Sequence, residues 1–135
     1  MTYTRLAVLL AILAASVFGG VTLAALEGRE VVVLHTFDAH GTSRKTRTWV
    51  ADDAGYVWVE AANESRPFLH NIQANPDVEL HRGGAMQRCR AVAMANPDGH
   101  ERIRRLLAQK YGWADRWVGL LTDTSGSMAV RLECR

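Results

Sequence analysis

The sequence has few of the features that identify common functional classes. Only two cysteines occur, Cys89 and Cys134, and they lack the close spacing of a metal-binding pair. The five histidines show no ligand spacing either, so we expect no metal site. The net charge of +2 is too small to predict a nucleic-acid-binding protein. No dinucleotide fingerprint, phosphate-binding loop or nucleophile elbow is present, which excludes the enzymes built on those motifs.

Lysine is also scarce. Of the 16 cationic side chains only Lys45 and Lys110 are lysines, so nearly all the positive charge is carried by arginine, with its fixed charge and forked donors. For the two cysteines the sequence leaves two interpretations open. We expect an ordinary pair of half-buried thiols, and a single disulfide is the alternative.

The longest apolar run lies near the N-terminus. Residues 6–26 carry no charge, and a helix of this length spans about 31 Å, which matches a hydrocarbon core of about 30 Å. The apolar region of a signal peptide is only about 7–15 residues, although Thr22-Leu23-Ala24 resembles a cleavage site. We therefore expect a retained single-pass anchor over residues 1–28, with a signal peptide as the alternative, and a domain over residues 29–135.

The flanking charges leave the orientation of this anchor open. Arg5 and the α-amino group favour a cytoplasmic N-terminus with the domain outside. Arg29, Arg44 and Lys45 follow the apolar run and favour the opposite orientation. We expect a membrane localisation, with the side of the membrane undecided.

The remaining chain predicts a mainly β domain with helices (α+β). Alternating or β-branched segments, bounded by turn residues, predict six strands at residues 30–37, 44–51, 56–62, 77–81, 85–95 and 127–135. A short helix is expected between the third and fourth strands and a helical pair before the sixth. An antiparallel sheet of six strands must curl or close to hide its edges, so we expect a small barrel with appended helices.

The polar chemistry is concentrated in the segment HGTSRKTRTWV, residues 40–50. It contains three cations and four hydroxyl side chains beside Gly41. On a strand, Lys45 and Arg47 share one face, while Arg44 lies on the other with Thr46 and Thr48. Such a donor cluster suits a phosphate or a carboxylate. The alternative is a solvated strand face that is attracted to acidic lipid headgroups.

Two segments, HGTSRKTRT and RPFLHNIQANPDVEL, resemble the deazaflavin-dependent nitroreductase and quinone reductase family. This family belongs to the split β-barrel group that also contains FMN-binding proteins similar to pyridoxamine-phosphate oxidase. The resemblance covers roughly residues 31–135 and leaves the apolar run outside. It rests on a basic loop that ends in Arg-Thr and on a helix that ends in Ala-Asn-Pro. The matching residues are Gly41, Ser43, Lys45, Arg47, Thr48, Pro67, Phe68, Asn71, Ile72 and residues 74–78.

This resemblance implies a six-stranded antiparallel split β-barrel of the FMN-binding type with a cofactor across its surface. The implied cofactor is reduced 8-hydroxy-5-deazaflavin, coenzyme F-420, with FMN as the alternative. Its phosphate tail is expected on Ser43, Lys45, Arg47 and Thr48. Its ring is expected near Trp49, Val50, Ala62, Asn63, Phe68 and Asn71. Because such a cofactor carries the hydride itself, we expect no catalytic acid or base.

The expected function is therefore transfer of hydride to a small flat oxidised substrate, a quinone or a nitro compound. The alternatives are an FMN-binding split-barrel reductase and a non-catalytic cofactor- or lipid-binding module at the membrane. A structural domain at the membrane surface is a third. The expected partners are the small-molecule substrate and membrane lipid, without nucleic acid. A homodimer is also expected, because a second copy can cover an exposed sheet face.

Overall fold

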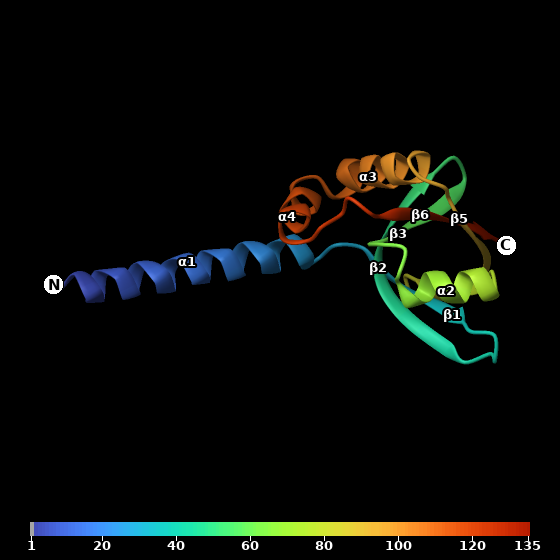
Figure 1. Cartoon of the computed structure of the whole chain (residues 1–135), viewed down its shortest axis with the longest axis horizontal. Helices are drawn as coiled ribbons and strands as arrows, with labels where there is room; N and C mark the ends of the chain where they lie inside the picture. The colour runs from blue at the N-terminus through green and yellow to red at the C-terminus, as the bar shows by residue number, and fades with distance from the viewer. Residues whose placement is uncertain (1) are drawn as a thin grey trace.

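A long helix projects from a small barrel with three further helices around it (Figure 1). The computed structural model describes residues 2–135. The helices are α1 (Tyr3–Leu26), α2 (Pro67–Ala74), α3 (Asp98–Tyr111) and α4 (Trp113–Leu121). The strands are β1 (Val31–Phe37), β2 (Ser43–Asp53), β3 (Tyr56–Ala61), β4 (Asp77–Arg82), β5 (Ala85–Ala93) and β6 (Met128–Cys134). All six predicted strands and all three predicted domain helices are present, with boundaries that differ by a few residues.

The six strands form a closed barrel in the order β1-β2-β3-β6-β5-β4. Every neighbouring pair is antiparallel, from β1–β2 round to β1–β4. The predicted antiparallel barrel is therefore confirmed. The ladders differ in length, since β1 and β2 share seven residue pairs but β1 and β4 only three.

The barrel core follows from the alternation of side chains along each strand. Val32 and Leu34 of β1 face inward and are fully buried, as are Val130 and Leu132 of β6. α2 adds three apolar side chains to this core, Phe68, Leu69 and Ile72. The short helix is thus held by its apolar face, because eight residues are too few for a stable isolated helix.

A second apolar cluster lies outside the barrel under α3. Ile103 and Leu107 of α3 pack there against Trp58 of β3, which is 1% exposed and points away from the barrel interior. Gly112 ends α3 and starts α4 with a φ of 56°. A positive φ suits glycine, and it turns the chain between the two helices where the sequence predicted that α3 ends.

α1 is long and apolar enough to cross a membrane by length and composition, with a mean hydropathy of 2.4 over its most apolar window. None of that window is buried in the protein, and a signal sequence meets the same criteria. The C-terminal end of α1 packs on α4. The Phe18 and Trp117 ring centroids lie 5.6 Å apart, and Trp117 Nε1 donates to Thr22 Oγ1 at 3.0 Å. Ala25 is fully buried in the second cluster.

The two cysteines are bonded to each other. Cys89 of β5 lies directly opposite Cys134 of β6, and their sulfur atoms form a disulfide. The preferred expectation of two separate thiols is therefore wrong, and the alternative of one disulfide holds. Spacing in the sequence did not reveal the pair, because β5 and β6 become neighbours only when the barrel closes.

Candidate functional site

The barrel wall opens where β2 and β3 separate. The β2–β3 ladder runs from Asp53↔Tyr56 to Val50↔Val59 and goes no further. β2 continues from residue 49 back to residue 43, still paired with β1 on its other side. Within residues 2–135, the backbone of residues 43–49 therefore has a strand partner on one edge alone. The start of α2, together with α3 and α4, surrounds this opening.

The larger hollow at this opening, which we call the main hollow, has a volume of about 680 Å³. Ligand pockets commonly measure about 300–1,000 Å³, so its size suits a small organic molecule. Its lining comes from β2, β3 and the segment that follows it, α2, α3, α4 and the segment after α4. The lining residues are Arg44, Thr46, Arg47, Thr48, Trp49, Glu60, Ala62, Asn63, Arg66, Pro67, Phe68, Arg104, Leu107, Asp115, Val118, Gly119, Thr122, Asp123 and Thr124.

A smaller hollow, which we call the loop hollow, lies where the β1–β2 loop meets α2. Its volume is about 350 Å³, and its lining residues are Asp38, Thr42, Ser43, Arg44, Lys45 and Asn71. Arg44 lines both hollows, so the two adjoin. Nine of the ten residues predicted to hold the cofactor line one hollow or the other.

The tenth, Val50, lies elsewhere. Its side chain is fully buried in the barrel core, opposite Val59, and lines neither hollow. The alternation of β2 explains this position, because Trp49 and Val50 must point to opposite faces. The backbone of Val50 is also occupied, since its N–H donates to the Tyr111 hydroxyl at 3.1 Å.

The register of β2 confirms the predicted alternation of the basic segment. Lys45 lies opposite His35, on the outer face of the barrel. Arg44 lies opposite Thr36, which is completely buried, so its strand face is the interior one. The long arginine side chains then reach round the free edge of β2, and both Arg44 and Arg47 line the main hollow.

Four cations at the two hollows have no carboxylate partner. Within the described part of the chain, Arg44, Lys45, Arg47 and Arg66 take part in no ion pair, whereas Arg104, which also lines the main hollow, takes part in two. All four are exposed. Unpaired guanidinium and ammonium groups around a hollow provide charge-assisted donors for an anion such as a phosphate or carboxylate.

The loop before β2 is held in shape by Asp38. Its Oδ1 atom accepts the backbone N–H of His40 at 2.8 Å and of Thr42 at 2.9 Å. The bonds from Thr42 and His40 lower the pKa of this carboxyl group. Because Ser43 and Lys45 follow directly, this turn fixes where the basic strand begins.

An aromatic wall borders the main hollow. Trp49 stacks on Tyr111, with ring centroids 4.2 Å apart and planes 11° from parallel. The Tyr111 hydroxyl lies 2.9 Å from the Val50 carbonyl oxygen and 2.8 Å from that of Glu30. These contacts fix the indole ring from behind, so that Trp49 is a rigid apolar surface for a flat ligand.

Three of the predicted site residues also have structural roles. Phe68 is 4% exposed and packs chiefly in the barrel core. The Asn71 side chain donates to the buried Thr36 hydroxyl at 3.1 Å. The Asn63 side-chain oxygen accepts from the Ser65 N–H and hydroxyl at 3.0 and 2.7 Å. A ligand contact at these positions would be additional to the packing and bonding that the structure displays.

A charged cluster in the wall of the main hollow was not predicted from the sequence. Arg104 of α3 lies between Glu60 of β3 and Asp115 of α4, at 3.0 and 2.7 Å. Burial lowers the pKa of Arg104, but the bonds to Glu60 and Asp115 outweigh that effect and raise it overall. These residues belong to three separated elements, so no sequence motif unites them. Arg66 was missed as well, although it precedes the proline of α2.

A third hollow, of about 610 Å³, lies along β4 and β5 near the C-terminus. It contains none of the predicted cofactor residues, and its cations Arg88, Arg90 and Arg135 are accompanied by Asp77, Glu79 and Glu133. We place the candidate site at the main and loop hollows, because the split in the barrel opens there and nine of the ten predicted cofactor residues line them.

The chain is similar to known proteins in sequence and in fold. The model of the F420H(2)-dependent quinone reductase family matches residues 13–131. The match begins within α1, earlier than the expected start near residue 31. No curated protein is similar enough in sequence to match.

Three solved structures illustrate the shared fold. An F420-H2 dependent reductase (FDR-A) has a TM-score of 0.58 at 19% identity, over 76% of this chain and 93% of that one. A conserved hypothetical protein from Mycobacterium tuberculosis has a TM-score of 0.57 at 17% identity, over 90% and 79%. A putative pyridoxamine 5'-phosphate oxidase from Listeria innocua has a TM-score of 0.58 at 14% identity, over 88% and 94%.

The likeness to these structures confirms the predicted split-barrel fold, and the family match covers most of the chain. The match also selects the deazaflavin over FMN as the cofactor. The chain therefore belongs to the F420H(2)-dependent quinone reductase family and is a deazaflavin-dependent oxidoreductase.

Proposed function

We propose that this chain reduces a small flat oxidised substrate, a quinone or a nitro compound, at the split between β2 and β3. When bound, coenzyme F-420 supplies the hydride. The observation that carries the proposal is the set of four unpaired cations, Arg44, Lys45, Arg47 and Arg66, around two adjoining hollows. A cofactor with an anionic tail and a flat ring needs this combination of donors and apolar surface.

The side chains at the two hollows fit such a cofactor. Ser43 and Lys45 line the loop hollow and would hold the phosphate tail, with Arg47 and Thr48 next along β2. Arg44 lies between the two hollows and joins this set. Charge-assisted hydrogen bonds of this kind contribute about 1.5–3 kcal/mol each.

The apolar part of the main hollow would hold the ring. Trp49 offers a flat face backed by Tyr111, and Ala62, Asn63 and Phe68 lie on the opposite side of the split. Asn71, in the loop hollow, completes the predicted ring set. Val50 is no part of this proposal, because its side chain lies in the core. The residues of the chain bind and orient, and we assign none of them to proton transfer.

The cofactor role is tested by binding. We expect the double substitution Lys45→Ala with Arg47→Ala to weaken binding of F-420 at least about 10-fold, since it removes two charge-assisted contacts. It should also reduce the salt dependence of binding. Fluorescence titration of the full chain in detergent measures both. Arg88→Ala with Arg90→Ala is the matched control, because these exposed cations belong to the third hollow. Equal affinity for the cofactor in all three proteins would refute the phosphate role.

Turnover distinguishes an enzyme from a binding module. Reduced F-420 should be oxidised by the wild-type chain when a soluble quinone or a nitroaromatic compound is added, as followed by absorbance. Tight binding of the cofactor without turnover of either acceptor would favour a carrier or storage role.

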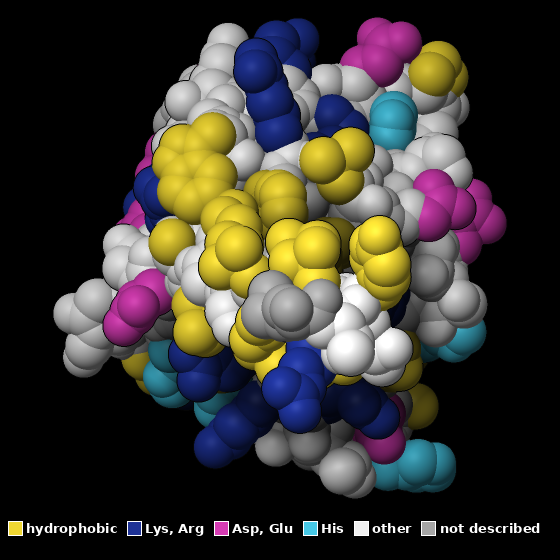
Figure 2. Space-filling view, turned by 90° about the vertical axis from the view of Figure 1, so that its left-hand side faces the viewer, with side chains coloured by type: hydrophobic (Ala, Val, Ile, Leu, Met, Phe, Trp, Pro, Cys, Tyr) yellow, Lys and Arg dark blue, Asp and Glu magenta, His cyan; other side chains and the backbone are white. Residues whose placement is uncertain are grey.

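The same proposal includes a membrane anchor over residues 1–28 and a catalytic domain over residues 29–135. Three large apolar side chains of α4 lie exposed beside α1: Trp113 at 50%, Leu120 at 81% and Leu121 at 45%. Viewed along α1, hydrophobic side chains gather at this end of the molecule, with basic side chains next to them (Figure 2). Such a surface suits the interface of a bilayer from which an apolar quinone could enter.

Carbonate extraction of membranes tests the anchor. The full chain should remain in the pellet, and a chain lacking residues 1–28 should be released. Release of the full chain would exclude a retained span. A homodimer, the remaining part of the proposal, predicts twice the monomer mass in light scattering of the detergent-solubilised protein.

A further inference from the structure

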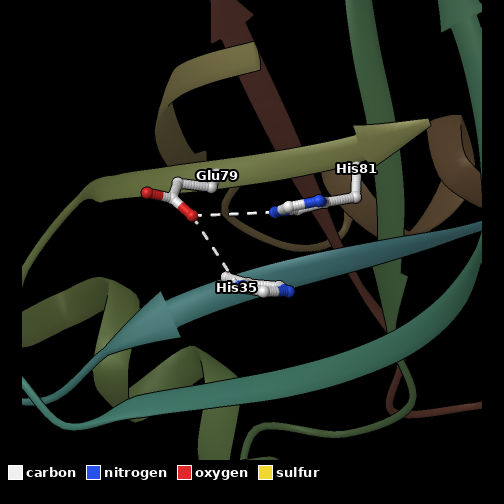
Figure 3. Close-up of side chains that lie close together, drawn as sticks. All are labelled: His35, Glu79 and His81. Carbon is white, nitrogen blue, oxygen red and sulfur yellow. Dashed lines mark ion pairs between the residues drawn. The ribbon is translucent and has the colours of Figure 1, made fainter. Parts of the chain in front are cut away.

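Two histidines and a glutamate converge on the outer face of the barrel, where β1 meets β4. His35 of β1 lies directly opposite Glu79 of β4. His81 lies two residues beyond Glu79 on the same strand, so its side chain points to the same face. Figure 3 shows the three side chains grouped together, with both rings near one carboxylate oxygen.

The spacing of the three potential ligand atoms approaches that of a metal site. Glu79 Oε2 lies 3.7 Å from His35 Nδ1 and 3.6 Å from His81 Nε2, and one potential ligand atom from each of the three residues lies within 4.8 Å of the other two. A tetrahedral zinc ion with bonds of about 2.0–2.1 Å separates its ligand atoms by about 3.3–3.4 Å. The two nitrogen–oxygen distances thus need to shorten by only a few tenths of an ångström.

The protein itself leaves this group incompletely bonded. Among residues 2–135, the buried His81 Nε2 has no hydrogen-bond partner, which is rare and unfavourable for a polar atom. The separations from Glu79 are too long for hydrogen bonds. The two imidazole rings stack, with centroids 4.1 Å apart.

We propose that His35, Glu79 and His81 bind a divalent transition-metal ion, with zinc as the best match to two nitrogens and one oxygen. Metal binding would turn the stacked rings apart so that both lone pairs meet the ion. All three side chains are partly exposed, between 16% and 39%, so a modest turn of the His81 ring would bring its buried Nε2 atom to an ion that arrives from solvent. Three protein ligands leave the fourth position to water.

Two cations border the site and limit its affinity. Lys45 lies opposite His35 on β2, and Arg88 lies opposite Glu79 on β5. Both side chains are positively charged and repel a metal cation. We therefore expect weaker metal binding than at a closed site with four protein ligands.

The position of the site indicates what the ion would do. The β1–β4 ladder has three residue pairs, fewer than any of the other five ladders. This ladder closes the barrel between its first and fourth strands. An ion that bridges His35 to Glu79 and His81 would fasten the two strands together and stabilise the folded state in proportion to its occupancy.

The test uses the full chain in detergent, with no polyhistidine tag and after treatment with a chelator. Cobalt(II) should produce the visible absorption of a tetrahedral site at one equivalent, and zinc should displace it. Zinc should also raise the thermal midpoint, and a chelator should reverse the rise. Absence of cobalt and zinc binding to the wild type would overturn the proposal.

Substitutions localise the site. His35→Gln with His81→Gln should weaken zinc binding at least about 100-fold, because second-shell changes alone cost about 10–100-fold. His70→Gln, at an exposed histidine of α2, should bind zinc like the wild type. Glu79→Gln retains both histidines and should weaken binding about 10-fold or more, which keeps the proposal testable if the double variant does not fold. Wild-type zinc affinity in Glu79→Gln and in the folded double variant would refute it.

Discussion

At the scale of single residues, the β2–β3 hairpin contains an alanine in a conformation that favours glycine. Ala54 has a φ of 53° and is followed by Gly55 with a φ of 81°. Both residues are thus in the left-handed region, as the tight two-residue turns between antiparallel strands require. The methyl group of an L-residue is unfavourable there, so the conformation of Ala54 lowers the stability of the folded protein.

We expect Ala54→Gly to increase the free energy of unfolding by about 0.5–1 kcal/mol. Urea denaturation measures the change. Ala108→Gly, on the exposed face of α3, is the control and should lower the stability by about 1 kcal/mol, because its backbone is helical. A loss of stability in both variants would show that the turn is not strained.

A second residue-scale prediction concerns Arg104. Asp115 is 5% exposed and depends on this guanidinium for compensation of its charge. Removing one partner of a buried pair costs about 3–5 kcal/mol. We therefore expect Arg104→Ala to lower the free energy of unfolding by about 3 kcal/mol, and the exposed neighbour Arg105→Ala to change it by less than about 0.5 kcal/mol. Equal urea midpoints for the two variants would contradict this role.

Residue-scale prediction from sequence succeeded where a local pattern existed. The alternation along β2 placed Arg44 and Lys45 on opposite faces, and the structure agrees. The same rule, applied to Trp49 and Val50 together, would have put Val50 in the core. The cluster around Arg104 had no local pattern, because it assembles from three separate elements. In the histidine–glutamate group Glu79 and His81 are near in sequence, but His35 comes from a distant strand.

At the scale of secondary-structure elements, Arg82 joins the ends of three strands. Its guanidinium donates to Glu30, just before β1, at 2.9 Å and to Asp52 of β2 at 2.7 and 2.8 Å. Lys110 of α3 also pairs with Glu30. The bonds from Arg82, then those from Lys110, lower the pKa of Glu30, and the bonds from Arg82 lower the pKa of Asp52.

These shifts predict a pH dependence. A carboxyl group whose pKa is lowered by folding stabilises the protein above its unfolded pKa, and this contribution disappears as the pH falls through the folded value. We expect Arg82→Ala to cost about 1 kcal/mol at pH 7, a modest value because the groups are partly exposed. The difference from the wild type should shrink toward pH 3. Urea denaturation at pH 7, 5 and 3 tests this, and a constant difference would contradict it.

Element-scale prediction was the most successful part, because the period of the apolar residues directly determines strand and helix positions. The split between β2 and β3 was not predicted from the pattern. Residues 43–49 of β2 have strand composition, and the pattern does not indicate that the ladder with β3 ends at Val50↔Val59.

At the scale of the whole molecule, the disulfide fixes the last strand. Cys89 and Cys134 are 45 residues apart, and their bond closes a loop that contains α3 and α4. A bridge over a loop of this length typically contributes about 2–4 kcal/mol, mainly by restricting the unfolded chain. We expect Cys89→Ser with Cys134→Ser to lower the unfolding midpoint in urea. A reductant should lower the midpoint of the wild type to the same value, and an unchanged midpoint in both cases would contradict the bridge.

The free edge of β2 has a consequence for the handling of the empty protein. Unpaired backbone donors and acceptors on a strand edge are a template for addition of a strand from another molecule, which is a common route to aggregation. In this barrel, residues 43–49 offer such an edge, and their cations repel a second identical edge. A ligand bound in the split would cover this edge, and salt screens the repulsion between the cations. Preparations that lose the ligand or are kept at high salt should therefore precipitate sooner.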